Sequence, residues 1–149
     1  MFEILPLNND HIAEIMVIEN ACHTHPWNEK LMLSCLTGRY FARGLFAKNQ
    51  LVAFYVAEQA GPDITLIDIC VSPAYQGQGL GKKLMHDLEK NAQQRSAELM
   101  FLEVRESNTT AFNLYQNCGF DFNGRRKNYY PDGEDAMLMM KTLLDEIEF

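Results

Sequence analysis

Three glycines at alternate positions follow a segment that reads as a buried strand. The apolar run ends at Val71, and Gly77, Gly79 and Gly81 precede an apolar pattern with helical spacing that begins at Leu80. Glycine lets the backbone approach a ligand closely and take positive φ, and the first N–H groups of a helix lack partners within it. The segment therefore predicts a site for an anion, with phosphate the best fit.

Lys82 and Lys83 would lie in the first turn of this helix. Cations there oppose the helix dipole and cost about 0.3–1 kcal/mol each, whereas a bound polyanion would reverse the sign. An ordinary glycine turn with two solvated lysines remains the alternative. Two other phosphate loops are excluded: Lys82 is followed by lysine rather than Ser or Thr, and Gly81 comes one residue too early for G-x-G-x-x-G.

A single carboxylate, that of Glu103, lies within the apolar segment 99–104, which reads as a strand. Alternation places Phe101, Glu103 and Arg105 on one face of it. A carboxylate in apolar surroundings is costly unless it is paired or hydrated. Glu103 is thus either in an ion pair, with Arg105 or another base, or a general base that faces a water-lined cleft.

Asn108 and Tyr115 lie seven residues apart in the next predicted helix and so share one of its faces. With Asn108 in the first turn, this face would run beside a ligand that crosses the helix end. Tyr115 is equally compatible with a core aromatic residue whose hydroxyl is hydrogen-bonded.

The cysteines and histidines show no metal or disulfide spacing. The four cysteines are Cys22, Cys35, Cys70 and Cys118. They contain no C-x-x-C pair, so we expect free and mostly buried thiols. Cys70 has no histidine near it in sequence, which disfavours a cysteine nucleophile. His23 and His25 have no third ligand, so the sequence predicts no metal site.

The hydrophobic pattern around these residues predicts alternating strands and helices along the chain. The predicted strands are 2–6, 40–47, 51–59, 64–71, 99–104, 120–123 and 135–142. The predicted helices begin near residue 12 and cover 29–36, 80–94 and 108–117, and residues 125–131 form a basic and aromatic loop. This order predicts one α/β domain, residues 1–149, with a mixed sheet and helices on both faces.

Composition narrows the classes of partner. A formal charge of −7 argues against nucleic acid as the main ligand, and the acidic segment 145–148 reads as a solvated tail. No apolar run reaches the length of a membrane span, and the first residues lack the basic and apolar regions of a secretory signal. We therefore expect a cytoplasmic protein that does not bind membranes.

The motif Gln76-x-x-Gly79-x-Gly81 resembles the pyrophosphate loop, Q/R-x-x-G-x-G/A, of the GCN5-related N-acetyltransferase (GNAT) family. The resemblance extends over essentially the whole chain. It implies the GNAT fold, an α/β (α+β) arrangement with a mostly antiparallel sheet of about seven strands and about four helices on both faces. It also implies acetyl-coenzyme A as co-substrate and no metal. The family often has arginine where this chain has Gly77.

The resemblance also implies roles for individual residues. The coenzyme contacts would be Ile69, Cys70, Val71, Gln76, Gly77, Gln78, Gly79, Leu80, Gly81, Lys82 and Asn108. Amides of the loop would hold the pyrophosphate, and the strand near Val71 would pair with the pantetheine arm. Glu103 would serve as catalytic base and Tyr115 as general acid.

Three further segments, 22–27, 102–105 and 126–131, resemble the RimI subgroup, the bacterial ribosomal-protein alanine N-acetyltransferases. This likeness implies direct acetylation, in a ternary complex, of a protein N-terminus, that of small-subunit ribosomal protein eighteen. Trp27, Tyr129 and Tyr130 would line the peptide channel. Two alternatives stay open: an acetyltransferase of a small amine such as a polyamine or antibiotic, and a non-catalytic domain that senses acyl-coenzyme A.

Overall fold

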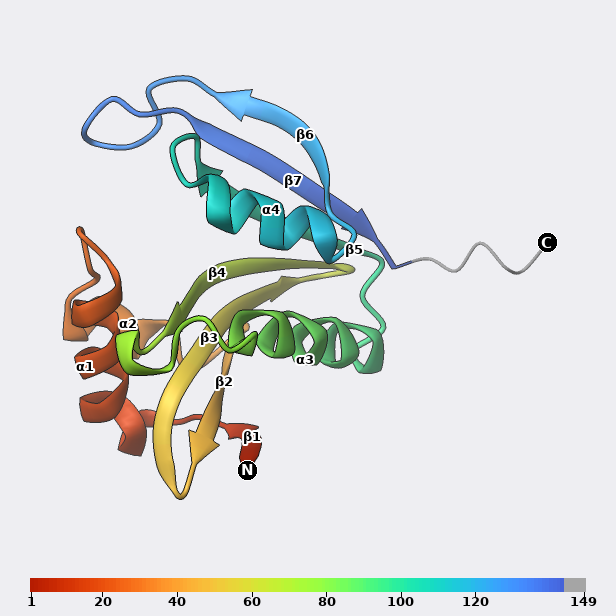
Figure 1. Ribbon diagram of the computed structural model, residues 1–149. Coiled ribbons are helices and arrows are strands. Elements are labelled where there is room, and N and C mark those ends of the chain that lie inside the picture. The colour runs from red at the N-terminus through yellow and green to blue at the C-terminus, as the bar shows by residue number, and fades with distance from the viewer. Residues whose placement is uncertain (144–149) are drawn as a thin grey trace.

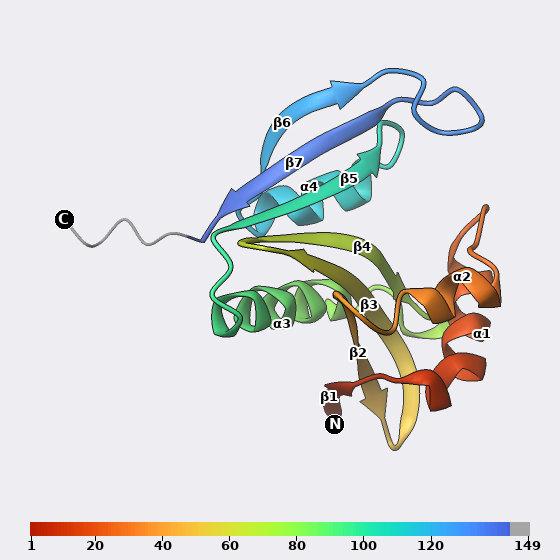
Figure 2. The same ribbon diagram turned by 180° about the vertical axis from the view of Figure 1, so that it is seen from behind.

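A computed structural model describes residues 1–143, so the acidic segment 145–148 lies outside the described residues (Figures 1 and 2). The strands are β1 (Phe2–Pro6), β2 (Tyr40–Ala47), β3 (Gln50–Ala60), β4 (Asp63–Val71), β5 (Leu99–Arg105), β6 (Asp121–Arg126) and β7 (Ala136–Thr142). The helices are α1 (Ile12–Cys22), α2 (Glu29–Ser34), α3 (Leu80–Gln94) and α4 (Thr109–Asn117), with short 3-10 turns η1 (Asn9–His11) and η2 (Pro73–Tyr75). No helix within the described range has the length and apolarity needed to span a membrane.

The strands form one seven-stranded sheet in the order β1-β2-β3-β4-β5-β7-β6. Every neighbouring pair is antiparallel except β4 with β5. The predicted mixed, mostly antiparallel sheet is confirmed. The predicted end of β6 is wrong, because Arg125 and Arg126 pair with Met137 and Ala136 instead of lying in a loop. β6 is an edge strand with polar side chains, so its sequence lacks the apolar alternation that marks a half-buried strand.

β4 and β5 separate soon after they meet. They pair only at residues 63–65 of β4 with 99–101 of β5. Beyond this point β4 keeps β3 as its neighbour and β5 keeps β7, and the two strands diverge (Figure 2). The second half of β4 therefore presents a free backbone edge in the middle of the sheet, where an extended ligand can add as a strand.

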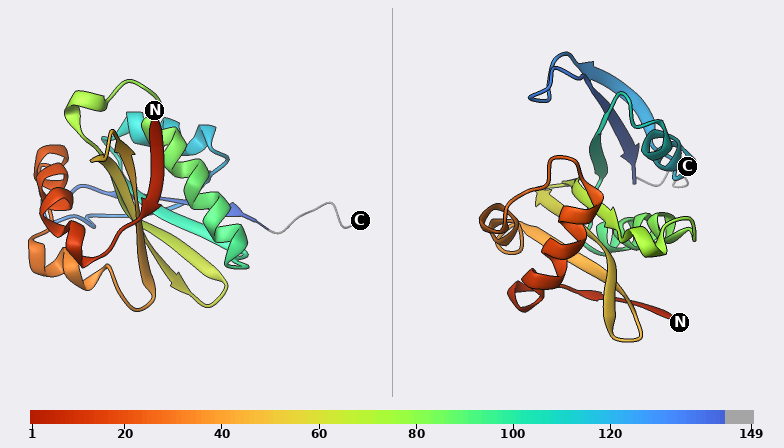
Figure 3. Two further views of the ribbon diagram at one scale, coloured as in Figure 1. Left: turned by 90° about the horizontal axis from the view of Figure 1, so that it is seen from below. Right: turned by 60° about the vertical axis from the view of Figure 1, so that its left-hand side comes forward.

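Two hydrophobic cores cover the two faces of the sheet. α1 and α2 lie on one side of β2–β4 and α3 on the other, as Figure 3 shows. The first core includes Ile15, Ile18, Met32, Phe54 and Cys70, and the second includes Tyr55, Leu84, Leu88, Leu102, Tyr115 and Phe120. β3 contributes alternate residues to both cores, so it is buried on both faces and fixes the position of β4 beside it.

Candidate active site

The turn between β4 and α3, residues 76–82, is termed the glycine turn. Gly77 and Gly79 have φ of +82° and +78°, so the prediction of left-handed glycines is confirmed. A Cβ on Gly79 would meet no atom within 4 Å, so the requirement there is backbone conformation and not space. The side chain of Gln76 donates from Nε2 to the Val71 carbonyl oxygen at 3.0 Å, which fastens the turn to the end of β4.

The start of α3 points unpaired amides out of the glycine turn. Gly79 is the N-cap, and Lys83 N–H is the first in α3 with a described backbone acceptor, donating to Gly79 O at 3.2 Å. The preceding N–H groups of the helix are available to a ligand. Gly81 has a different role, because a Cβ there would lie 3.3 Å from Leu114 Cδ2. It allows α3 and α4 to pack closely.

A cleft of about 820 Å³ lies between β4, the glycine turn, β5 and α4. Most of the residues singled out in the sequence line it: Ile69, Cys70, Val71, Gln76, Gly77, Gly79, Leu80, Gly81, Lys82, Glu103, Asn108, Tyr115 and Tyr130. Three others, Gln78, Trp27 and Tyr129, do not line this cleft. Trp27 packs at the edge of the α1 and α2 core, whereas Tyr129 is exposed. The structure thus brings together residues from four separate segments.

Val71 directs a backbone donor into the cleft. Its carbonyl oxygen accepts from Cys22 Sγ at 2.9 Å and from Gln76, whereas the next residue, Ser72, donates its N–H to Val52 O on β3. Because the N–H and C=O of one strand residue point to the same edge, the Val71 N–H faces away from β3. It lies where a carbonyl group in the cleft could accept from it.

Tyr115 provides a buried hydroxyl at the cleft. The residue is 6% exposed, and its ring meets Phe120 edge-on at a centroid distance of 6.4 Å. No residue in the described range forms a hydrogen bond with the hydroxyl, so the interpretation of a satisfied core tyrosine is wrong. Burial raises the pKa of Tyr115 above its ordinary value. The side chain is therefore a neutral O–H donor at physiological pH.

Glu103 is accessible at the cleft and has a basic neighbour. Its side chain is 34% exposed, and Arg126 Nε lies 3.5 Å from Glu103 Oε2. A hydrogen bond to Glu103 raises the pKa of Tyr129. The expected ion pair is thus found with Arg126 rather than Arg105. An exposed pair of this kind leaves the second carboxylate oxygen open to water or substrate.

Arg105 holds the loop that presents Tyr130. Its Nη1 lies 2.9 Å from both Asp132 Oδ2 and Glu134 Oε1, and its guanidinium stacks on the Tyr130 ring at 4.0 Å. These contacts join the end of β5 to residues 130–134. Tyr130 is thereby fixed at the cleft by a side chain whose planar charge suits both partners.

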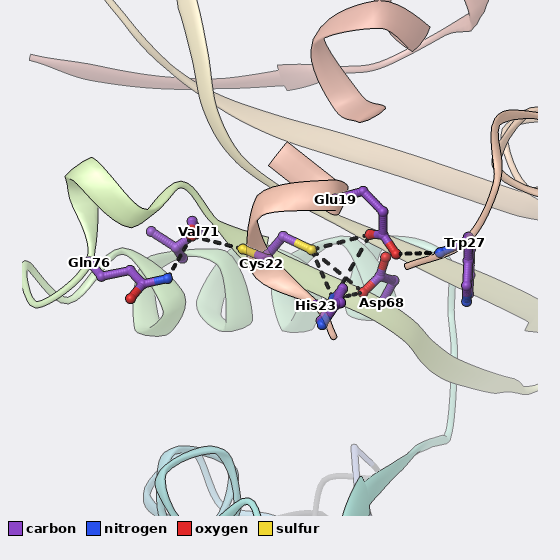
Figure 4. A network of polar contacts seen from close by, with 8 residues as sticks. Glu19, Cys22, His23, Trp27, Asp68, Val71 and Gln76 are labelled. Carbon is purple, nitrogen blue, oxygen red and sulfur yellow. Dashed lines mark hydrogen bonds and ion pairs between the residues drawn. The ribbon is translucent and has the colours of Figure 1, made fainter. Parts of the chain in front are cut away.

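Sequence reasoning missed one group of side chains, termed here the α1–β4 cluster: Glu19, His23, Asp68 and Cys70 (Figure 4). His23 Nε2 lies 2.9 Å from Asp68 Oδ1 and 3.0 Å from Cys70 Sγ. The statement that His23 has no further ligand partner is therefore wrong. Two spacings carried the signal: Glu19 and His23 are one helical turn apart, and Asp68 and Cys70 share a strand face.

Burial shapes the ionisation of this cluster. It raises the pKa of Glu19 to about 7, and the neighbouring Asp68 adds to the shift. The hydrogen bond to Asp68 raises the pKa of His23. Contact with Cys22 and burial raise the pKa of Cys70, so its thiol stays protonated on its own, in keeping with the prediction that it is not a nucleophile.

Comparisons with known proteins agree with this geometry. Residues 12–120 match the acetyltransferase (GNAT) family. The [ribosomal protein bS18]-alanine N-acetyltransferase of Escherichia coli strain K12 is 39% identical over 125 residues, 82% of this chain and 84% of that protein. The crystal structure of the Escherichia coli ribosomal-protein-S18-alanine N-acetyltransferase superposes with a TM-score of 0.92 at 34% identity, covering 100% of this chain and 99% of that one.

A more distant structure shares the fold. It is a GNAT family acetyltransferase from Elizabethkingia anophelis with acetyl-CoA bound, with a TM-score of 0.80 at 20% identity, covering 95% of this chain and 98% of that one. The family match covers more than half of the chain, and the Escherichia coli relative exceeds 30% identity over more than two thirds of it. The protein belongs to the acetyltransferase (GNAT) family.

Proposed function

We propose that this protein transfers the acetyl group of acetyl-coenzyme A to a protein N-terminus, the N-terminal alanine of ribosomal protein bS18. One observation supports it above the others: the glycine turn, the free edge of β4, Glu103 and Tyr115 all border one cleft. The name of the Escherichia coli relative supports the choice of acceptor. Ribosomal proteins are made in the cytoplasm, which is where we place the reaction.

The glycine turn would hold the coenzyme A pyrophosphate. The unpaired amides before Lys83 and the positive end of α3 suit a diphosphate, and Lys82 adds a positive charge at the cleft. The pantetheine arm would lie along the free edge of β4 from Ile69 to Val71 as an added strand. Asn108 at the N-cap of α4 would contact the coenzyme from the opposite wall.

In this arrangement the amine attacks the thioester directly. The Val71 N–H would polarise the thioester carbonyl, so that negative charge on its oxygen meets a fixed donor. An α-amine has a pKa of about 7.7–8.0, so Glu103 has a modest deprotonation task, directly or through water. The C–N bond forms as the C–S bond breaks, and the Tyr115 hydroxyl gives its proton to the departing thiolate. Positioning of the two substrates supplies much of the acceleration.

The acceptor peptide would enter beside the loop that Arg105 holds. Tyr130 lines the cleft and meets Tyr129 edge-on at 5.1 Å, which gives the entrance an aromatic wall. Trp27 contributes from the other side through the segment that follows α1, whose backbone is tied to Glu19 at 3.0 Å. A small-amine acceptor would have no use for this wall, which favours a peptide.

A panel of acceptors tests the proposal. The protein is incubated with labelled acetyl-coenzyme A and a peptide of the bS18 N-terminus, the same peptide with a blocked α-amine, and a polyamine. We expect label on the free α-amine alone, located by mass spectrometry. Label on the polyamine but not on the peptide would favour the small-amine alternative. Tight coenzyme binding without turnover on any amine would favour the sensor alternative.

Substitution of Gly79 tests the coenzyme site. Alanine in the left-handed region costs about 1–2 kcal/mol, and relief of this strain would move the amides of the glycine turn. We expect Gly79→Ala to raise the KM for acetyl-coenzyme A about tenfold. Gly61→Ala is the matched control, because Gly61 has φ of +60° and equally open space but lies in the β3–β4 turn. Similar stability loss with similar KM in both variants would contradict the assignment.

A further inference from the structure

We propose that the α1–β4 cluster is a binding site for a divalent transition-metal ion, with Zn²⁺ as the ion that its donors fit best. The four ligands would be Glu19 Oε1, His23 Nε2, Asp68 Oδ1 and Cys70 Sγ. Three of these residues border the cleft, so the ion would lie beside the proposed reaction site. The inference stands on the cluster alone and does not depend on acetyl transfer.

The ligand atoms already approximate a tetrahedron. From His23 Nε2 the distances are 2.9 Å to Asp68 Oδ1, 3.0 Å to Cys70 Sγ and 3.9 Å to Glu19 Oε1. From Cys70 Sγ they are 3.4 Å to Glu19 Oε1 and 3.7 Å to Asp68 Oδ1. Zinc bonds of about 2.0–2.3 Å at tetrahedral angles imply edges of roughly 3.3–3.6 Å, so each donor needs to move by about half an ångström or less.

The charge of the cluster calls for a cation. The side chains of Glu19 and Asp68 are 1% and 8% exposed, and His23 is the basic group that contacts both. Asp68 Oδ2 is buried and has no hydrogen-bond partner among residues 1–143. A buried carboxylate oxygen without a partner is costly, and a bound dication would offset the negative charge around it.

Neighbouring groups aim the ligands into the site. Trp27 N–H donates to Glu19 Oε2 at 3.0 Å, which leaves Oε1 directed at Cys70 (Figure 4). Asp68 and Cys70 are two residues apart on β4 and project from the same face toward the end of α1. Such support fixes ligand orientation and raises affinity.

The donor types select the metal. Calcium and magnesium take six or more oxygen ligands, whereas one thiolate, one imidazole and two carboxylate oxygens in a tetrahedron suit zinc. The bound ion would join the end of α1 to β4. It would thereby fix the Cys22–His23 segment at the wall of the cleft.

Metal loading of the reduced, chelator-treated full chain tests the site. We expect one equivalent of Zn²⁺ to remain after gel filtration, and a hundredfold excess over the Kd to raise Tm by roughly 5–10 °C. With Co²⁺ we expect the visible bands of a tetrahedral complex and a thiolate charge-transfer band. Cys70→Ser should abolish the charge-transfer band. Cys118→Ser is the matched control, because Cys118 is also a buried free thiol but belongs to the other core, and it should keep the band.

A second variant covers the case in which Cys70→Ser does not fold. The His23 side chain is 38% exposed, so His23→Gln should fold, and it should weaken Zn²⁺ binding at least tenfold. Failure of the wild-type chain to retain zinc would overturn the proposal. So would a charge-transfer band that persists in Cys70→Ser, or zinc affinity that is unchanged in His23→Gln.

Discussion

Replacing Tyr115 with phenylalanine is expected to lower kcat about 10²–10⁴-fold, the usual contribution of a positioned general acid. The hydroxyl borders the cleft and has no hydrogen-bond partner in the described part of the chain, so its removal leaves no other group unsatisfied. Burial keeps the phenol protonated, which is the form that a departing thiolate requires. Single-turnover measurement with the peptide substrate gives the rate of the chemical step, and KM should change little.

Tyr55→Phe is the matched control for this prediction. Tyr55 is buried in the same core as Tyr115, but its hydroxyl donates to Asp87 at 2.7 Å and lies outside the cleft. We expect this variant to lose about 1.5–3 kcal/mol of stability, because a bond to a charged group is broken, and to keep its rate. Wild-type turnover in folded Tyr115→Phe, or equal rate losses in both variants, would remove Tyr115 from the mechanism.

Glu103→Gln is expected to lower kcat/KM about 10²-fold at neutral pH. Below the pKa of an α-amine, about 7.7–8.0, most of the acceptor is protonated and needs a base. Above it the free amine predominates, so the deficit should shrink as pH rises to about 9. Stability should change by less than about 1 kcal/mol, because the Glu103–Arg126 pair is largely exposed. A pH–rate profile of both proteins measures the effect.

Glu106→Gln provides the control for the loss of charge. Glu106 follows β5, is 50% exposed and pairs with Arg125. It removes the same charge from the same region without touching the cleft, so its rate should stay within about twofold of wild type. A deficit in Glu103→Gln that is constant from pH 6 to 9 would show that the carboxylate positions substrate instead of accepting a proton.

The parts of the site that follow one another in the chain could be predicted from the sequence. The end of β4, the glycine turn and α3 form one continuous segment, and its turn residues and apolar period are local properties. The left-handed Gly77 and Gly79 follow from the same segment, since few other residues adopt that conformation. Alternation in β5 correctly placed Glu103 on the face opposite Leu102 and Val104.

The contacts between distant segments could not be predicted in the same way. His23 meets Asp68 across 45 residues only because α1 packs against β4, and no local pattern encodes that docking. Arg105 binds Asp132 and Glu134 in a loop whose sequence gave no partner. The unpaired hydroxyl of Tyr115 likewise depends on the separation of β4 from β5, which is a property of the whole sheet. Side-chain partners of this kind require the tertiary arrangement.

The central claim is that the amides at the start of α3 hold a diphosphate and so direct the acetyl group past Val71. A crystal structure with coenzyme A bound tests it most directly. We expect pyrophosphate oxygens within hydrogen-bond distance of the glycine-turn amides, and the pantetheine arm extended along the free edge of β4. A nucleotide seated elsewhere, with the glycine turn free of ligand, would contradict the account.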